Sequence, residues 1–363
     1  MRRFNPTGSS SALVANVSTG AALQPELWYT RCPLPTATSV AIDHGFFAEE
    51  FTPDGIEILS LRASAERSAR EGHFDHNQSN LFRQGGNIPP IWSRAAGADS
   101  VVIGASWLHE FQAVIALPEA GLRTPADLAG KRLGLPRRVN DSIDYWRAMC
   151  LRGYLAALDA GGLTGADVTF VDLPVTERQI PTGASSATGT LWNGATRARR
   201  QQQEGFALIR GACDAIYTAG APGAELTAFL GAEIVADLGN DTVRRHRINN
   251  QNPVVLTVSG ELLRTRPAMV DRYLRALVQA GAWAASHPDE TRRTIANDVG
   301  AGEEWVDAAY GDRISDRLTI ALDEPLIAAI DAQKQYLFEH GFIARDFDVR
   351  SWIDPEPLRR SLT

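Results

Sequence analysis

A cysteine in a proline-rich turn has the residue type and the surroundings for chemistry on an anion. Cys32 stands in the segment YTRCPLP, residues 29–35, between an expected first strand and an expected first helix. Backbone N–H groups near the start of a helix attract anions and favour a thiolate, and Arg31 would add positive charge if it turned the same way. Pro33 and Pro35 would hold the thiol on a stiff turn. A buried cysteine with a structural role is the alternative.

An arginine followed by two glycines forms a second candidate. Arg83 precedes Gly85 and Gly86 in the segment LFRQGGNIPP, residues 81–90. A guanidinium offers a fork of donors, and glycine lets backbone N–H groups approach an anion closely. The pattern predicts an oxyanion clamp, with a surface arginine before an ordinary turn as the alternative.

Two histidines, His73 and His76, flank Asp75 at a spacing that could suit a metal pair. No third ligand follows a matching pattern and there is no HExxH motif, so we expect no metal. We expect His76 to face solvent and His73 to be functional. The sequence also lacks a phosphate loop, a dinucleotide fingerprint and a GxSxG motif, so no cofactor is expected.

Alternating strand and helix patterns must position these residues. Strands are expected at 56–60, 101–105, 112–117, 132–135, 168–173, 215–217, 232–238 and 254–259, and helices at 37–51, 141–160, 201–211, 225–230 and 261–287, with two or three short helices at the end. Thr124 and Pro125 would open a helical turn that Gly130 ends. The alternation predicts parallel sheets with helices on both faces and a ligand beyond the carboxyl ends of the strands.

Composition limits the classes of protein to consider. The 363 residues fit about two domains, and 44% hydrophobic with 22% charged residues is globular composition. A net charge of −7 argues against nucleic acid or an anionic membrane as partner. Three cysteines without CxxC spacing argue against a disulfide framework or a structural zinc site and suit the reducing cytoplasm. No run of ~18 apolar residues suggests a membrane span, and residues 1–24 have the composition of a disordered tail rather than of an export signal.

Three longer segments carry a resemblance to known proteins. The strings DLAGKRLGL, FALIRGACDAIYT and SGELLRTRPAMVDRYLRALVQAGAWAASHPDET occur in this order. They are similar to solute-binding proteins of the nitrate, sulfonate and thiamine-precursor type. The resemblance implies an α/β, type II periplasmic-binding-protein-like fold, with two lobes of mixed or parallel sheets flanked by helices and a hinge of two crossovers. Lobe one would comprise residues 25–118 plus 240–363, and lobe two residues 119–239.

The two chemical segments together carry a sharper resemblance. The patterns YxxCPxP, HFxxxQ and RxGGxIPP resemble the 2′-hydroxybiphenyl-2-sulfinate desulfinase family of biodesulfurisation pathways. The resemblance implies Cys32, His73 and Arg83 as the catalytic set, with His73 and Arg83 ten positions apart as in the family. The substrate-binding positions that it implies are Gly86, Phe74, Pro33, Gln78, Gly85 and Trp107.

Departures from the family concern the neighbourhood of these positions. The family has Glu where this chain has Asn87, and Thr-Pro where it has Ser106 and Trp107. Gln112 also falls on a family position. These departures leave the exact aromatic substrate open. Further aromatic residues that could line a cleft are Trp92, Trp146 and Trp192. Residues 182–193 could form a lid or an idle loop, and we expect the arginine runs 197–200 and 244–247 to be solvated.

The implied activity is hydrolysis of an aryl carbon–sulfur bond, which would release sulfite and an arene such as 2-hydroxybiphenyl in dibenzothiophene desulfurisation. Cys32 would protonate the ipso carbon as a thiol or attack sulfur as a thiolate. The expected partner is a small aromatic sulfinate, and the expected state is a cytoplasmic monomer without a cofactor. One alternative is a non-catalytic binder of a sulfonate, nitrate or pyrimidine-like solute. Another is a thiamine-precursor synthase-like enzyme, whose His-rich and Cys-rich iron-binding segments are missing here.

Overall fold

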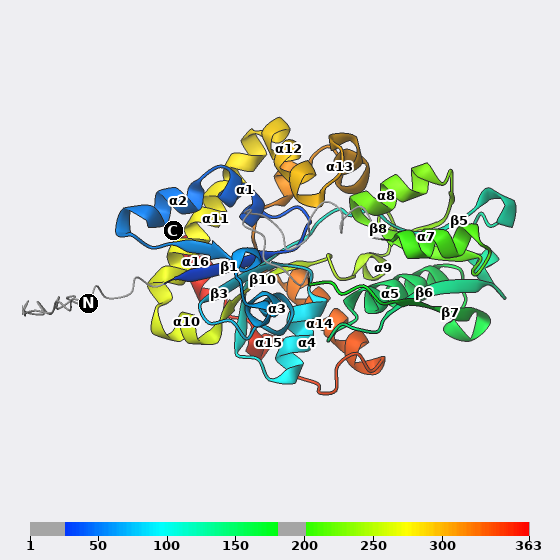
Figure 1. The fold of residues 1–363 in the computed structure, drawn as a ribbon, viewed down its shortest axis with the longest axis horizontal. Helices are drawn as coiled ribbons and strands as arrows, with labels where there is room; N and C mark the ends of the chain where they lie inside the picture. Colours follow the sequence, from blue (N-terminus) through cyan, green and yellow to red (C-terminus); the bar gives the residue numbers. More distant parts are fainter. Residues whose placement is uncertain (1–25, 181–200, 363) are drawn as a thin grey trace, which may run out of the picture.

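Two five-stranded sheets, each flanked by helices, form two lobes in the computed structural model, which describes residues 26–180 and 201–362 (Figure 1). The sheet of lobe one has the order β2-β1-β3-β10-β4, and that of lobe two the order β7-β6-β8-β5-β9. The expected α/β fold with two lobes is confirmed. The predicted tail 1–24, the predicted loop 182–193, Trp192 and the arginine run 197–200 lie outside the described residues.

The strands follow the apolar segments of the sequence closely. They are β1 (Leu27–Arg31), β2 (Ile58–Ser60), β3 (Leu81–Gly85), β4 (Ser100–Ser106), β5 (Gln112–Ala116), β6 (Arg132–Arg138), β7 (Thr169–Val175), β8 (Ala215–Ala219), β9 (Glu233–Asp237) and β10 (Val254–Ser259). Every residue of β3, β5 and β8 is buried, as expected for central strands covered on both faces.

The helices cover the faces of both sheets. They are α1 (Ala37–Asp43), α2 (Phe46–Phe51), α3 (Arg67–Asp75), α4 (Ile88–Ala96), α5 (Tyr145–Ala160), α7 (Gln202–Ile209), α8 (Gly220–Phe229), α9 (Arg244–Arg247), α10 (Gly260–Thr265), α11 (Pro267–Ser286), α12 (Pro288–Val299), α13 (Glu303–Tyr310), α14 (Glu324–Glu339), α15 (Val349–Trp352) and α16 (Glu356–Ser361). Single 3₁₀ turns are η1 (Thr52–Asp54), η2 (Leu61–Ala63), η3 (Pro118–Ala120), η4 (Pro125–Leu128), η5 (Gly165–Asp167) and η6 (Ile314–Arg317). No described helix is long and apolar enough to cross a membrane.

Both sheets are mixed rather than parallel. β1 pairs in parallel with β2 and β3, but β10 pairs antiparallel with β3 and β4. In lobe two, β6 is parallel to β7 and β8, whereas β5 is antiparallel to β8 and β9. The first strand after each crossover, β5 in lobe two and β10 in lobe one, is therefore antiparallel to its neighbours. The local alternation of strands and helices in the sequence does not reveal this direction.

Two crossovers join the lobes, between β4 and β5 and between β9 and β10. The sequence placed residues up to 118 in lobe one, but β5 belongs to the second sheet, so the first crossover is residues 107–111. The second crossover, residues 238–253, contains α9.

Local signals explain several other differences from the expected elements. The helix expected over 37–51 is two helices, because Gly45 adopts a left-handed φ of 81° between them. The break at Pro267 is confirmed, and η4 has the expected Thr124 cap with Gly130 at φ 72° beyond it. The expectation of only short helices at the C-terminus is wrong, because α14 has 16 residues.

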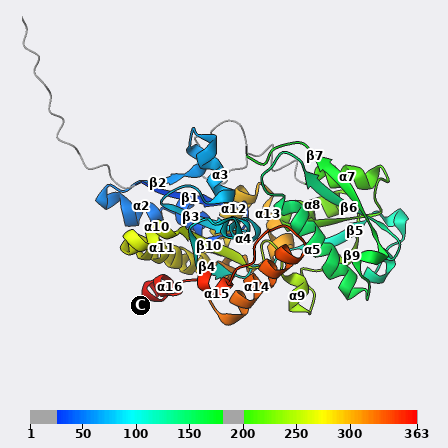
Figure 2. The same cartoon turned by 90° about the horizontal axis from the view of Figure 1, so that it is seen from below.

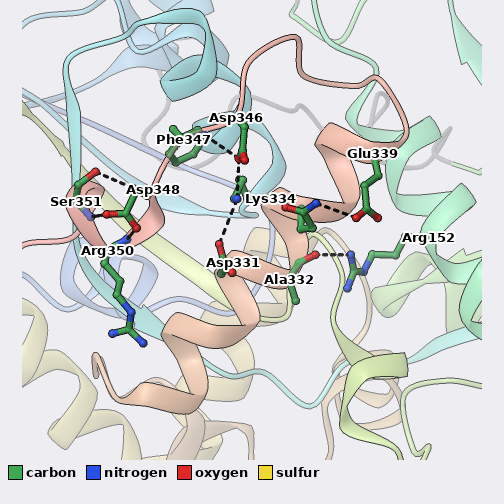
Figure 3. A network of polar contacts seen from close by, with 11 residues as sticks. Arg152, Asp331, Ala332, Lys334, Glu339, Asp346, Phe347, Asp348, Arg350 and Ser351 are labelled. Atoms are coloured by element: carbon green, nitrogen blue, oxygen red, sulfur yellow. Dashed lines mark hydrogen bonds and ion pairs between the residues drawn. The ribbon is translucent and has the colours of Figure 1, made fainter.

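C-terminal helices bridge the two lobes on both sides of the crossovers. Tyr336 of α14 donates its hydroxyl to the Ala148 carbonyl of α5 at 2.8 Å. Arg152 of α5 donates to the Ala332 carbonyl of α14 at 3.2 Å (Figure 3) and to the Ile248 carbonyl of the second crossover at 2.7 Å. Figure 2 shows α14 beside α5, and α13 packs against α8 of lobe two. The hydrophobic core is accordingly continuous across the lobes.

Arg152→Met should destabilise the protein by about 2 kcal/mol, because two carbonyls lose a charged donor that they share between the lobes. Urea unfolding at neutral pH would measure the loss. Arg350→Met removes only an exposed ion pair with Glu324 and serves as the matched control, with a change of less than about 0.5 kcal/mol. Equal effects of the two substitutions would contradict a bridging role for Arg152.

Candidate active site

Adjacent parallel strands bring the two chemical segments together. Thr30 of β1 pairs in register with Arg83 of β3, and Cys32 follows directly after β1 at the carboxyl edge of the sheet. The Cys32 N–H donates to the Gln84 carbonyl at 3.1 Å, which extends the pairing past the strand. This position beyond the strand end is where the sequence placed the site.

Side-chain hydrogen bonds hold the turn that carries the thiol. Thr36 caps α1 by accepting from the Ser39 N–H. The Gln84 side-chain oxygen accepts from the Thr38 N–H at 3.0 Å and from the Thr38 hydroxyl at 2.7 Å. Gly85 is required here, because a Cβ at this position would collide with Cys32 Sγ.

His73, in the last turn of α3, contacts the thiol. Its Nε2 lies 3.5 Å from Cys32 Sγ, and its Nδ1 lies 2.8 Å from Thr30 Oγ1. The Thr30 hydroxyl therefore fixes the orientation of the imidazole toward Cys32. Thr30 was not among the predicted site residues, although its place two residues before the cysteine on an alternating strand puts both side chains on one side of the sheet.

Arg83 is a buried cation beside the same thiol. It is 0% exposed, and its Nη2 lies 3.6 Å from Cys32 Sγ. Its Nε donates to the His73 carbonyl at 2.8 Å and its Nη1 to the Gly86 carbonyl at 2.9 Å. No carboxylate within the described residues forms an ion pair with it. Burial lowers the pKa of Arg83, while Cys32 and Tyr145 act in the opposite direction. The surface alternative for this arginine is wrong.

His76 is half-buried and hydrogen-bonded through both ring nitrogens, rather than fully solvent-facing as expected. Its Nε2 lies 3.0 Å from the Thr257 hydroxyl and its Nδ1 lies 3.0 Å from the Ser93 hydroxyl. Burial, and then the charge of Arg83, lowers the pKa of His76 to about 3. The neutral imidazole thus adds no second cation beside Arg83.

Arg31 does not serve the site either. Its guanidinium is buried against the Asp298 carboxylate and the Ser39 hydroxyl, away from Cys32. Burial lowers the pKa of Arg31. Arg83 is therefore the cation at the thiol.

The Gly86 turn is fastened to the second crossover. The Asn250 carbonyl accepts from the Asn87 N–H at 2.6 Å, and the Asn250 side chain accepts from the Ile88 N–H at 2.9 Å. Asn87 donates its side-chain amide to the Asn249 and Pro253 carbonyls. The N–H groups of Asn87 and Ile88 are thus both hydrogen-bonded, whereas the Gly86 N–H has no hydrogen-bond partner among the described residues. Asn250 gave no signal in the sequence, because its partners are distant along the chain.

Two hollows of the interlobe cleft flank the catalytic candidates. The first encloses about 1070 Å³ including its open mouth, and its lining includes Pro33, Tyr145 and Trp146. The second encloses about 570 Å³, again with its mouth, and its lining includes Phe74 and Trp92. The Phe74 and Tyr145 rings stack with centroids 6.1 Å apart, which puts an aromatic pair next to His73. A flat aromatic ligand in these hollows would contact Pro33 and Phe74, the chain neighbours of Cys32 and His73, whereas Cys32, His73 and Arg83 themselves line neither hollow.

Other predicted positions lie elsewhere. Gln78 donates to the neighbouring Ser79 carbonyl at 3.4 Å in the turn before β3. Trp107 lies in the first crossover with the Arg244 guanidinium 4.3 Å from its ring centroid, and it lines neither hollow. Gln112 is buried and accepts from the Tyr217 hydroxyl at 2.9 Å. The run 244–247 forms α9, in which Arg244 and Arg245 are exposed as expected while they contact Trp107 and Asp159.

The remaining cysteines are unsuited to catalysis. All three cysteines are free. Burial raises the pKa of Cys150 well above its ordinary range and that of Cys213 to about 11. Both therefore stay neutral thiols. No group of three or more metal-ligating side chains occurs in the parts of the chain that the structure describes.

Comparison with known proteins defines the class to which this fold and site belong. The chain belongs to the family described as NMT1/THI5 like, which matches residues 35–291. It is also similar to the 2′-hydroxybiphenyl-2-sulfinate desulfinases of Rhodococcus erythropolis and Rhodococcus qingshengii, with 29% identity over 99% of this chain and 98% of each relative. These matches confirm the resemblance to desulfinases that the motifs indicated.

Solved structures agree with this assignment. A crystal structure of a cysteine-to-serine variant of DszB with biphenyl-2-sulfinic acid has a TM-score of 0.74 at 28% identity, over 93% of this chain and 98% of that chain. The desulfurization enzyme DszB alone gives a TM-score of 0.73 at 27% identity, over 93% and 99% of the two chains. The periplasmic sulphonate-binding protein SsuA from Escherichia coli shares the fold, with a TM-score of 0.63 at 16% identity over 91% and 92%.

Gly85→Ala should destabilise the protein by about 1–3 kcal/mol, because the added Cβ meets Cys32 Sγ and Cβ within a packed turn. Urea unfolding would measure the change. Gly165→Ala is the control, since a Cβ there makes only ordinary contacts, and a change below about 0.5 kcal/mol is expected. A Gly85→Ala protein as stable as this control would contradict the close packing of Gly85 on the thiol.

Acid should weaken the fold through His76. An unfolded histidine titrates near pH 6.5, whereas the folded His76 has a pKa of about 3. The unfolded chain therefore binds the extra proton, and stability that is complete above about pH 6.5 declines as the pH falls toward 3, by about 2 kcal/mol at pH 5. His76→Asn tolerates the left-handed φ of 58° and should flatten this decline, measured by urea unfolding at pH 7 and pH 5. Identical pH slopes in both proteins would exclude His76 as the cause.

Proposed function

We propose that this protein is a desulfinase that cleaves the aryl carbon–sulfur bond of an aromatic sulfinate such as 2′-hydroxybiphenyl-2-sulfinate and releases sulfite. The observation that carries the proposal is the buried Arg83 guanidinium, 3.6 Å from Cys32 Sγ and without a carboxylate partner in the described residues. A buried cation of this kind is costly unless an anion joins it. The similarity to named desulfinases supports a sulfinate as that anion.

Each member of the site has a chemical task in this proposal. Arg83 and the Gly86 N–H hold the sulfinate oxygens, and the stacked Phe74 and Tyr145 rings contact the aromatic body. The cleft beside them excludes part of the solvent, which strengthens the contact between Arg83 and the sulfinate. Cys32 acts at the C–S bond, and His73 orients its thiol.

The reaction consumes one water molecule. The C–S bond breaks, the ipso carbon takes a proton, and sulfur takes the hydroxide oxygen to give hydrogen sulfite. Two routes use the geometry: the Cys32 thiol protonates the carbon, or its thiolate attacks sulfur and water then hydrolyses the intermediate. A profile of rate against pH separates them, because the first route requires the thiol and the second the thiolate.

A cytoplasmic monomer completes the proposal. Three free, buried cysteines suit a reducing compartment.

Sulfite release from 2′-hydroxybiphenyl-2-sulfinate by the purified protein tests the function directly. The wild type should release sulfite, and Cys32→Ser should reduce kcat on the order of 1000-fold or more. Cys213→Ser is the matched control, because this second thiol is buried in lobe two, and it should retain wild-type turnover.

A wild-type protein that binds sulfinates, seen as a rise in Tm, but releases no sulfite would overturn the proposal in favour of a solute binder. Equal turnover by the wild type and Cys32→Ser would remove Cys32 from the mechanism.

A further inference from the structure

A glutamine in the wall of the cleft has an unsatisfied side chain. Gln179, after β7, contributes to the lining of both hollows. Its backbone N–H donates to Asp141 at 3.0 Å, which fixes its position. The side chain is only 3% exposed, and neither its Oε1 nor its Nε2 has a hydrogen-bond partner among the described residues. A buried amide in this state is unfavourable, so a ligand that supplies the missing partners gains affinity.

The charges around Gln179 do not attract a second anion strongly. Arg138 is already paired with Asp141 at 3.5 Å and donates to the Glu177 carbonyl at 3.0 Å. Arg138 and Arg178 line the first hollow together with Glu177 and Glu204, so positive and negative side chains balance there. A primary amide both donates and accepts, and the partner that uses both atoms is a neutral group such as a hydroxyl.

Gln179 lies across the cleft from the catalytic candidates. Pro33, the neighbour of Cys32, shares the first hollow with it, and Phe74, the neighbour of His73, shares the second. A sulfinate held by Arg83 in lobe one therefore directs its aromatic body toward lobe two. The part of the substrate that reaches Gln179 is the ring that does not carry sulfur.

We propose that Gln179 is a specificity-determining residue that binds a neutral hydroxyl on the remote ring of the aryl sulfinate. Nε2 donates to the hydroxyl oxygen, and Oε1 accepts its proton. This inference rests on the proposed function and adds to it the residue in lobe two that distinguishes hydroxylated from plain biaryl sulfinates.

Gln179→Leu tests the inference through two substrates that differ only in this hydroxyl. The wild type should show a kcat/KM for 2′-hydroxybiphenyl-2-sulfinate about tenfold above that for biphenyl-2-sulfinate, the value of one good hydrogen bond to a buried group. Gln179→Leu should bring the ratio to about one. Gln335→Leu makes the same change on the exposed surface of α14 and should keep the wild-type ratio.

Stability provides a second readout that a damaged fold would not give. Removing an unsatisfied buried amide relieves its desolvation, so the Tm of ligand-free Gln179→Leu should rise. Sulfite from both substrates with an unchanged ratio in Gln179→Leu would overturn this inference alone. No sulfite from either substrate with the wild type would overturn the proposed function and this inference with it.

Discussion

A positive charge without a buried counter-ion is the constraint on which this structure depends. Arg83 is fully buried, and it is held by two backbone carbonyls and the Cys32 thiol rather than by a carboxylate. An Asp or Glu beside Arg83 would offset the electrostatic cost of burying its charge, but the carboxylate would occupy the place of an anionic ligand. The surroundings of Arg83 instead avoid placing a second positive charge beside its guanidinium. His76 stays neutral, and Arg31 is diverted to Asp298.

The lobes of this protein are shared with solute binders, but the fold leaves the chemistry open. SsuA has the same architecture at 16% identity, so the architecture accommodates sulfonate binding as well as the site described here. The chemistry of the site described here depends on a thiol between an imidazole and a guanidinium, all three from neighbouring elements of one lobe. Lobe two adds the aromatic and amide wall of the cleft. In the proposed reaction, the lobe that binds the anion thus supplies the reacting group, and the other lobe contacts the rest of the ligand.

Local sequence indicated where the candidate catalytic groups meet, because each of them lies close in the chain to the element that positions it. Cys32 directly follows an alternating strand, and the paired glycines after Arg83 mark a turn at the end of the next strand. Parallel neighbours in one sheet then bring the two ends together. The antiparallel entry of β10 and the attachment of the Gly86 turn to Asn250 depend on partners far along the chain. Periodicity contains no signal for such contacts.

The two prolines that open α4 have a consequence for the fate of the product. Pro89 and Pro90 have no N–H groups, and Asn250 occupies the amides of Asn87 and Ile88, so the start of this helix has few donors to offer an anion. Arg83 and the Gly86 N–H together match two oxygens, the number that a sulfinate has. Hydrogen sulfite has three, and it is more strongly hydrated in water than in a pocket with donors for two. In the proposed reaction, the turn would therefore retain the reactant in preference to the inorganic product, which would leave the cleft free for the next turnover.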